Sequence, residues 1–481
     1  MKPGVVPHRR DPRPCDPYYL KTRQPNLPAG MRRGRGRQGH FSKPPTCLPL
    51  LAVDPYRLCP MLTLTGSRVA RTTTLCVLYA AQGMPWGFVT IALLSYLAGQ
   101  GAGLAETAKI SSLATLPWTF KLFWGPIIDR FTLRSMGRRR PWIILAQFAM
   151  SVTLLAMILI GDLTAEFETL AWMVFVHNCF VSLQDVASDA LAVDVLLDSE
   201  RGTVNGLMWA SNYAGTAIGG AGMGTVIANY GLRPAFCLQA AVLLGILCLP
   251  LFIRERAGEK LLPWSKGEAK LEPGEERTES IAGLTRGLVG ALKSWPAFLG
   301  VLFAFAGSIT VGMRVAVMPV FYTQEVGWTD AHFAQVEGGI GSGAGVLGAL
   351  LGGYLADRLG VKTVITLGLL GICGLCAAMG LSEGLRASQS FPLVFLLGTL
   401  FCISMMTVAG FALFMRLCTA AVAGTQYTLY MALANVARIS GAAIVASLSD
   451  RGYETIFCVM AIAILIPLPF LYLIREESGS S

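Results

Sequence analysis

Two stretches of the sequence, Gly125-Pro-Ile-Ile-Asp129-Arg130 and Gly352-Gly-Tyr-Leu-Ala-Asp357-Arg358-Leu-Gly360, have related endings. Each contains an Asp-Arg pair, and each pair directly follows a long apolar segment. Repeated halves in a membrane protein indicate two helix bundles related by an axis along the membrane normal, with the solute bound between them near the midplane. The repeat therefore predicts a chain built from two similar halves.

The composition places both halves in a membrane. Hydrophobic residues make up 53% of the chain and charged residues 14%, against roughly 25% charged residues in soluble domains. A bilayer core of about 30 Å requires roughly 20 apolar residues per helix, and twelve stretches meet this requirement. We expect an all-α integral membrane protein with twelve transmembrane helices in two pseudo-symmetric six-helix bundles. The predicted spans are residues 72–99, 108–127, 141–161, 168–193, 203–228, 234–253, 294–321, 333–356, 362–382, 391–415, 422–448 and 454–473.

The basic excess of the chain lies in its N-terminal segment. Residues 1–71 contain 14 Lys and Arg against 3 acids, while the whole chain has a formal net charge of +10. This proline-rich, basic segment is too poor in apolar residues to fold. It is either a disordered cytoplasmic tail or a region upstream of a true start at Met61. The predicted organisation is a tail over 1–71, an N-terminal six-helix bundle over 72–253, a cytoplasmic linker over 254–293, a C-terminal six-helix bundle over 294–473 and a short tail over 474–481.

The short loops predict the orientation in the membrane. The loop after the second span is rich in arginine, whereas the loop between Gly161 and Glu168 contains acids and no base. Lys and Arg concentrate in cytoplasmic loops, so we expect the second and central loops on the cytoplasmic side. With twelve spans, both termini are then cytoplasmic, in a multi-pass protein of the inner (plasma) membrane.

Several function classes are disfavoured. A nucleic-acid partner is not expected, because the basic excess is confined to the tail. The cysteines lie mostly singly in apolar runs, and Cys373 and Cys376 share an apolar helix with no second ligand pair nearby, so we expect no metal and no cofactor. The absence of a phosphate-binding loop or nucleophile elbow argues against an enzyme. His177 in the fourth span is either a packing residue or a proton relay.

The fourth span also contains the acids Asp185 and Asp189. Carboxylates are rare inside apolar spans and usually face an aqueous cavity or a partner. A spacing of four residues places both on one helical face, which suits the binding of a proton. Lys121 in the second span lies at a similar depth and is the predicted partner of Asp185. We expect Asp185, Asp189 and Lys121 to couple proton movement to transport, with a static ion pair as the alternative.

The second half offers cations inside its spans rather than acids, namely Arg314 and Arg438. Arginine binds carboxylates in bidentate geometry, so these residues predict an anionic solute, with structural pairing as the alternative. Gln82 lies beside Pro85 in the first span, and such a break is tolerated only against protein or a cavity. The predicted solute-binding residues are Gln82, Asn178, Gln184, Arg314, Gln426 and Arg438.

Glycine-rich faces on the fifth and eighth spans predict close contact between helices. These faces are Gly215, Gly219, Gly220 and Gly224, and Gly341, Gly345, Gly348 and Gly352.

The Asp-Arg stretches resemble the loop motif of the major facilitators, which clamps neighbouring helices on the cytoplasmic side. An aspartate at a helix end facing arginines forms a charge lock that opens when the two halves rock. Loop charges that only follow the cytoplasmic bias of Lys and Arg are the alternative. The predicted gating residues are Asp129, Arg130, Arg138, Asp357, Arg358 and Arg416.

A wider set of motifs resembles one branch of the major facilitators, the AmpG-type muropeptide permeases and the related acetyl-CoA transporters. The match covers residues 72–473. The motifs are Gln82-Gly-x-Pro85, Leu116-Pro-x-x-x-Lys121-x-x-x-Gly-Pro126-x-x-Asp129-Arg130, Gln184-Asp185-x-Ala-x-Asp189-Ala190, Glu200-Arg201-Gly202-x-x-Asn205, Met415-Arg416-Leu417-Cys418 and Thr425-Gln426-Tyr427.

The resemblance implies a major facilitator fold and proton-driven import of an anhydro-muropeptide for peptidoglycan recycling. Its partners would be a small solute, protons and the lipid bilayer, with the protein acting as a monomer. The run Gly137-Arg-Arg-Arg-Pro-Trp142 is similar to glycoside and sucrose symporters, so a simple sugar stays an alternative, as does an acetyl-CoA-like anion. A sensor or scaffold with the same fold is the alternative from another class.

Overall fold

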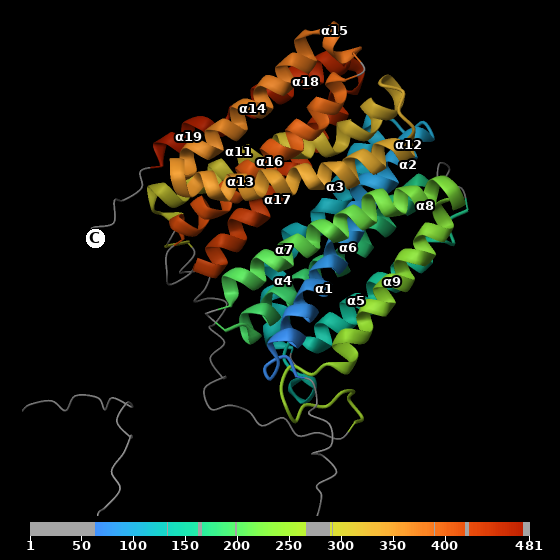
Figure 1. The fold of residues 1–481 in the computed structure, drawn as a ribbon, viewed down its shortest axis with the longest axis vertical. Coiled ribbons are helices and arrows are strands. Elements are labelled where there is room, and N and C mark those ends of the chain that lie inside the picture. Colours follow the sequence, from blue (N-terminus) through green and yellow to red (C-terminus); the bar gives the residue numbers. More distant parts are fainter. Residues whose placement is uncertain are drawn as a thin grey trace, which may run out of the picture. The chain divides into compact units, whose positions relative to one another are not determined.

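The computed structural model describes residues 63–474, apart from 132, 162–165, 198–199, 266–288, 291, 389 and 419–422. Residues 1–62, with the Met61 alternative, most of the predicted linker and residues 475–481 lie outside the described part. The described chain is helical, with one isolated backbone bridge between Thr63 and Arg254. Figure 1 shows the blue-to-green helices α1–α9 and the yellow-to-red helices α11–α19 as two groups.

The first group contains the six spans predicted for the N-terminal half, and its helix bounds lie within a few residues of the prediction. They are α1 (Arg68–Gly87), η2 (Phe88–Leu93) and α2 (Leu94–Gly99); α3 (Leu104–Thr115), η3 (Leu116–Phe120) and α4 (Lys121–Arg130); α5 (Arg140–Met157); α6 (Phe167–Val195); α7 (Arg201–Ala217), η5 (Ile218–Gly222) and α8 (Met223–Tyr230); and α9 (Leu232–Phe252).

The second group repeats this arrangement. Its spans are α11 (Trp295–Val320) and η6 (Phe321–Glu325); α12 (Asp330–Gln335), η7 (Val336–Ile340) and α13 (Gly341–Leu359); α14 (Val361–Leu381); α16 (Phe391–Leu417); α17 (Ala423–Ser447); and α18 (Tyr453–Ala463) with α19 (Pro467–Leu473). The short helices η4 (Arg134–Met136), α15 (Glu383–Arg386) and η9 (Ser449–Arg451) lie in the connections.

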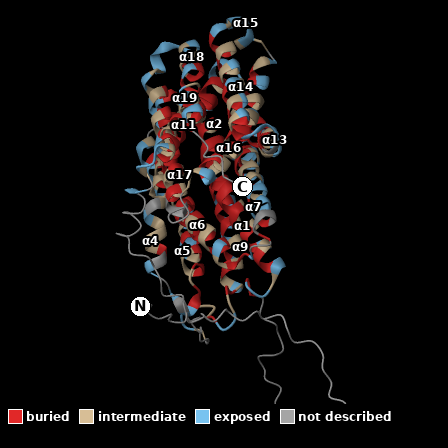
Figure 2. Cartoon of the chain, turned by 90° about the vertical axis from the view of Figure 1, so that its left-hand side faces the viewer, coloured by how far each residue is buried: buried red, intermediate tan, exposed pale blue. Residues whose placement is uncertain are grey.

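Ten helices of the described chain are long and apolar enough to cross a membrane. The two further predicted spans, 108–127 and 203–228, are also helical and are formed by α3–η3–α4 and α7–η5–α8. These two are more polar and more interrupted, because they contain Lys109, Lys121 and the glycines of η5. The chain is thus an all-α membrane protein with twelve spans, and its buried residues run along the interior of the helical part (Figure 2).

Glycine contacts show the repeat in three dimensions. On α7, a Cβ atom at Gly215 or Gly219 would lie 2.2 and 1.9 Å from the carbonyl oxygens of Ala80 and Met84 on α1. In the second half, a Cβ atom at Gly312 of α11 would lie 1.9 Å from the carbonyl oxygen of Arg438 on α17. Only glycine permits such a close approach. The first span therefore packs on the fifth as the seventh packs on the eleventh.

The predicted glycine face of the eighth span is also in close contact. A Cβ atom at Gly348 would lie 2.2 Å from the carbonyl oxygen of Phe401 on α16. The face predicted from sequence is confirmed for α13 as well as for α7.

Four π-helical segments interrupt the spans, and two of them meet between the halves. Pro85 inside α1 cannot donate a backbone hydrogen bond, and the π-helix η2 begins three residues later at Phe88. Segments η5 and η7 touch, since a Cβ atom at Gly338 would lie 2.6 Å from the backbone nitrogen of Ala221. Nearby, the side chain of Gln324 donates to the carbonyl oxygens of Ala98 and Ala102 at 3.0 Å each. The halves are joined tightly at this end of the spans.

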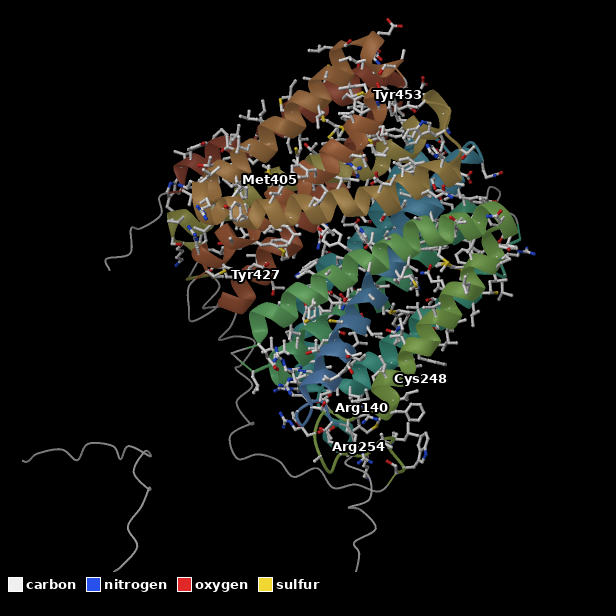
Figure 3. All side chains as sticks on the ribbon, in the orientation of Figure 1. Arg140, Cys248, Arg254, Met405, Tyr427 and Tyr453 are labelled. Carbon is white, nitrogen blue, oxygen red and sulfur yellow. The ribbon has the colours of Figure 1, made fainter. Side chains whose placement is uncertain are left out.

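At the opposite end of the first group, Arg140 makes hydrogen bonds that connect separate segments of the chain. It lies close to Arg254 in Figure 3. Arg140 is 2% exposed, and its guanidinium donates to the carbonyl oxygens of Leu251 at 2.9 Å and Leu261 at 2.6 Å. The carboxylate of Glu255 accepts the backbone N–H groups of Arg138 at 2.9 Å and Arg139 at 2.8 Å. The run after the second span is therefore tied to the chain that follows the sixth span.

Two acids near Arg140, namely Glu255 and Glu259, lie close together outside the spans. The backbone N–H of Glu255 donates to the carboxylate of Glu259 at 3.0 Å. Burial raises the pKa of Glu255, and burial together with the Glu255 charge raises the pKa of Glu259 to about 7.

Candidate functional site

An ion pair between Lys121 and Asp185 lies inside the first bundle, as the sequence predicted. Lys121 is the first residue of α4, and Asp185 lies in the middle of α6. The lysine side chain is 20% exposed and the aspartate side chain 9%. Because each charge is costly inside an apolar span, the pairing compensates both. Its role in transport stays a prediction.

The second carboxylate of the face, Asp189, has a different partner. It accepts a hydrogen bond from the hydroxyl of Tyr79 on α1 and forms no ion pair within the described part of the chain. The backbone carbonyl of Tyr79 in turn accepts the side-chain amide of Asn212 on α7 at 3.3 Å. The site thus contains two acids, of which Asp185 is ion-paired and Asp189 is hydrogen-bonded to a tyrosine.

The position of Lys121 depends on the short 3₁₀ helix η3 that precedes it. Pro117 lies in the first turn of η3, where a missing N–H is tolerated. The Lys121 ammonium lies 5.1 Å from the ring centroid of Trp118, a cation–π distance. Trp118 also meets Trp86 of α1 edge to face, with centroids 5.9 Å apart. Lys121 thus contacts the Trp118 ring as well as Asp185, and Trp118 is in turn packed against Trp86.

Three predicted polar residues line the same helices. Gln184 of α6 donates to the carbonyl oxygen of Leu78 at 3.3 Å, and Asn178 donates to Val174 at 2.9 Å on its own helix. Gln82 of α1 is 2% exposed, and its amide nitrogen has no hydrogen-bond partner in the described chain. A buried donor without a partner favours a polar ligand at this point.

His177 is buried in α6, and its Nδ1 lies 2.8 Å from the hydroxyl of Thr153 on α5. The other ring nitrogen has no hydrogen-bond partner among the described residues. This contact ties α6 to α5 and fits the packing alternative for His177.

Arg314 lies in the second bundle and is ion-paired there. Its two terminal nitrogens donate to the carboxylate of Glu337 at 2.8 and 2.7 Å, and its Nε donates to Thr399 at 3.2 Å. The expectation that the second half offers cations without buried acids is wrong, because Glu337 in η7 is 8% exposed. The sequence signal was present, since Glu337 lies within the predicted span 333–356. The pairing favours the structural alternative for Arg314.

Arg438 of α17 is the predicted cation that keeps an unused donor. Its Nη1 donates to the side-chain oxygen of Asn435 at 3.3 Å, while its buried Nε has no hydrogen-bond partner among the described residues. No carboxylate pairs with Arg438 in the described part of the chain. The amide of Asn435 donates to the carbonyl oxygen of Trp118 at 3.4 Å, so this group faces the first bundle.

Gln426 lies apart from Arg438, near the start of α17. Its amide donates to the carbonyl oxygen of Leu417 at 3.0 Å and to the hydroxyl of Tyr430 at 2.8 Å. Twelve residues of helix separate it from Arg438, which corresponds to about 18 Å along α17. The structure does not bring Gln426 together with Arg438, so the two belong to different parts of the bundle.

The predicted gating residues are only partly described. The side chains of Asp129 and Asp357 lie outside the described set, whereas Arg130 and Arg416 are exposed. The guanidinium of Arg358 lies 5.3 Å from the ring centroid of Tyr354. Arg138 is held through its backbone N–H by Glu255.

A clamp that sequence reasoning missed lies beside these residues. Arg139 donates through Nε to the carboxylate of Asp194 at 2.8 Å, at the end of α6. Glu255 and Asp194 are both distant in sequence from the arginine run, so no local sequence pattern predicted either contact.

Aromatic side chains connect the two bundles near the acid pair. Tyr79 lies edge to face with Trp209 of α7 at 6.2 Å, and Trp209 lies 6.2 Å from Phe411 of α16. Phe411 in turn contacts Tyr427 of α17 at 6.4 Å, and Tyr427 is labelled in Figure 3. The tyrosine that binds Asp189 is therefore in a row of rings that reaches the second half.

The charges of the described site are unequal in the two bundles. With the acids ionised, the site residues of the first bundle are two carboxylates and one ammonium, whereas among those of the second bundle Arg314 and Glu337 cancel and Arg438 is left over. A proton could neutralise the first surplus and a carboxylated solute the second. This arrangement can bind a proton and an anion together.

Comparisons with known proteins agree with the fold. The family model described as "Major Facilitator Superfamily" matches residues 74–442 and 301–481. The anhydromuropeptide permease of Escherichia coli K12 is 26% identical over 416 residues, covering 85% of this chain and 80% of the permease. A putative transporter AmpG 4 of Rickettsia conorii is 24% identical over 306 residues, covering 59% of this chain and 67% of that protein.

Solved structures share the fold at low sequence identity. A mutant form of the nucleoside transporter NupG superposes with a TM-score of 0.66 at 10% identity, over 84% of this chain and 100% of that one. A bacterial homologue of the human lysosomal transporter Spinster gives a TM-score of 0.63 at 13% identity, over 85% of this chain and 98% of that one. With twelve spans in two repeated groups and this family match, the chain is a membrane transporter rather than an enzyme, and it belongs to the major facilitator superfamily.

Proposed function

We propose that this transporter is a proton-coupled symporter that imports a peptidoglycan-derived anhydro-muropeptide, or a similar anionic glycoside, across the inner membrane. The observation that supports it most is the opposite charge surplus of the two bundles. Asp185 and Asp189 share Lys121 on one side, and Arg438 has a spare buried donor on the other. Binding a proton and a carboxylate satisfies both sides at once.

The same groups suggest how proton binding is coupled to solute binding. Protonation of one carboxylate leaves the Lys121 ammonium balanced by the other. Arg438 is then the cation that favours an anionic solute between the bundles. Gln82, Gln184 and Asn178 offer amide groups for the sugar hydroxyl and acetamido groups of a glycan. Both termini are proposed to be cytoplasmic, and the protein is proposed to act as a monomer.

The identity of the solute rests on the similarity to anhydromuropeptide permease. An acetyl-CoA-like anion would also satisfy Arg438, whereas a neutral sugar would leave its spare donor without a charged partner. The observed pairing therefore favours an anion over a simple sugar.

Uptake into proteoliposomes tests the proposal. Purified protein is reconstituted, and uptake of a labelled N-acetylglucosaminyl-anhydro-N-acetylmuramyl peptide is measured with and without an inward proton gradient. Accumulation above the external concentration is expected only with the gradient. Parallel assays with acetyl-CoA and sucrose assign the solute class. A protein that transports none of the three would be a sensor or scaffold, and the proposal would be wrong.

A further inference from the structure

Asn435 connects the two charged groups that the proposed function uses. It lies on α17 one turn before Arg438 and is 9% exposed. Its side-chain oxygen accepts from Arg438 at 3.3 Å, and its amide donates to the backbone carbonyl of Trp118 at 3.4 Å. The Asn435 side chain thus contacts Arg438 in the second bundle and the short helix η3 in the first.

Trp118 is the residue through which Asn435 meets the acid site. The ring of Trp118 lies under the Lys121 ammonium at 5.1 Å, while its carbonyl oxygen accepts the Asn435 amide. Lys121 is itself ion-paired with Asp185. A movement of the lysine therefore acts on the same short 3₁₀ segment that Asn435 holds.

The two bonds of Asn435 are long for N–H···O bonds, whose usual range ends near 3.2 Å. A displacement of a few tenths of an ångström breaks them, whereas the 2.7 and 2.8 Å bonds of Arg314 would survive it. The connection through Asn435 is thus suited to open and close.

We propose that Asn435 is a positioning residue that links the state of the Lys121–Asp185 pair to the orientation of Arg438. When Asp185 takes up a proton, Lys121 loses this ion pair and moves toward Asp189, Trp118 shifts with η3, and Asn435 no longer holds the guanidinium. Arg438 is then free to turn its donors toward a solute carboxylate. This inference rests on the proposed function and adds the path by which its two sites communicate.

A double-mutant cycle read by hydrogen–deuterium exchange tests the link without any solute. Exchange is measured at one pH for the parent, Asp185→Asn, Asn435→Leu and the double variant. Asp185→Asn imitates the protonated carboxylate. In the parent background it is expected to change the exchange rate of peptides covering 435–441 by roughly five-fold, the scale of one hydrogen bond. In the Asn435→Leu background the change is expected to be less than about two-fold. Equal responses in both backgrounds would overturn the proposal.

Two further variants guard against a general loss of structure. Asn229→Leu removes an exposed asparagine of α8 whose amide donates to Thr225 at 2.8 Å, and it should leave the response intact. Asn435→Asp keeps the oxygen that faces Arg438 and loses the donor to Trp118. If Asn435→Leu does not fold, this variant replaces it, and an undiminished response in the folded Asp variant would contradict the link.

A transport readout separates the link from the proposed function. In parent proteoliposomes the KM for the anhydro-muropeptide should depend on pH, and Asn435→Leu should flatten that dependence while the maximal counterflow rate stays within about two-fold. A parent-like pH profile in Asn435→Leu would overturn the link. If the parent transports no muropeptide, the proposed function fails, and the exchange cycle still decides the link.

Discussion

Two buried ion pairs, one in each bundle, differ in how completely their charges are balanced. Arg314 and Glu337 form a bidentate pair inside the second bundle, and Thr399 accepts a hydrogen bond from the Nε of Arg314. Lys121 pairs with Asp185, but Asp189 lies on the same helical face with a tyrosine as its partner. The carboxylate of a balanced pair is stabilised in its ionised form, whereas a site with one more acid than base favours the binding of a proton. We therefore assign a structural role to the first pair and a role in transport to the second.

Removing one half of the balanced pair should have the largest effect. Arg314→Met leaves the Glu337 carboxylate buried without a partner, and we expect the free energy of unfolding to fall by about 3–5 kcal/mol. Denaturation in detergent micelles measures the loss. The double variant Arg314→Met/Glu337→Leu should recover most of it, because an apolar pair removes both buried charges. A double variant as unstable as the single one would show that the pair is not balanced as described.

Breaking the unbalanced site should affect coupling more than stability. Asp185→Asn removes the carboxylate that holds Lys121, and gradient-driven accumulation should fall roughly 100-fold, near the upper range of coupling between two sites. Counterflow, which needs no net proton movement, should persist. Asp450→Asn, an exposed acid in η9, is the matched control and should accumulate like the parent. Parent-like accumulation by Asp185→Asn would place the proton site elsewhere.

The unpaired cation of the second bundle gives a smaller, selective effect. Arg438→Gln removes a charged donor, so the KM for a carboxylated solute should rise about 10-fold or more, while the KM for its amide should change little. Competition assays with the two solutes measure the difference. Arg451→Gln, which changes an exposed arginine in η9, is the control. An equal rise for acid and amide would point to general damage at the bundle contact.

The comparison extends outside the membrane, where Glu255 and Glu259 also lie close together. The pKa of Glu259 is raised from 4.5 to about 7 in the folded protein, so the folded state binds more protons between these values. Its stabilising contribution is present below pH 4.5 and is lost as the pH rises through 7. Between about pH 5 and 8 the parent should lose stability on the order of 1 kcal/mol relative to Glu259→Gln.

Thermal melting across this pH range measures the Glu259 effect. Glu383→Gln, which changes an exposed acid in α15, should follow the parent. If Glu259→Gln follows the parent as well, Glu259 does not titrate in this range.

The sequence predicted the features that depend on local composition. Apolar length predicted the spans, Pro85 predicted the break in the first span, and the depth of Lys121 and Asp185 predicted their pairing. Glycine spacing predicted the faces of α7 and α13. In each case the physical signal lies within one helix, or in two helices whose depths can be counted from the same loop.

The features that the sequence did not predict depend on contacts between distant elements. Glu337 was visible in a predicted span, yet its pairing with Arg314 depends on the contact between η7 and another span, α11. Asn435 lies among small apolar residues, and only the packing of α17 on η3 brings it to Trp118. The hydrogen bonds between Glu255 and the arginine run form because the segment after α9 lies beside that run. None of these contacts has a local pattern.

The central claim is that the surplus acid of the first bundle and the surplus cation of the second bind a proton and an anion in one cycle. Its most direct test is proton movement driven by the solute alone. Proteoliposomes containing a pH-sensitive dye receive an inward gradient of anhydro-muropeptide without an imposed pH gradient. The lumen should acidify with the parent protein and not with Asp185→Asn. Muropeptide entry without acidification in the parent would contradict the account.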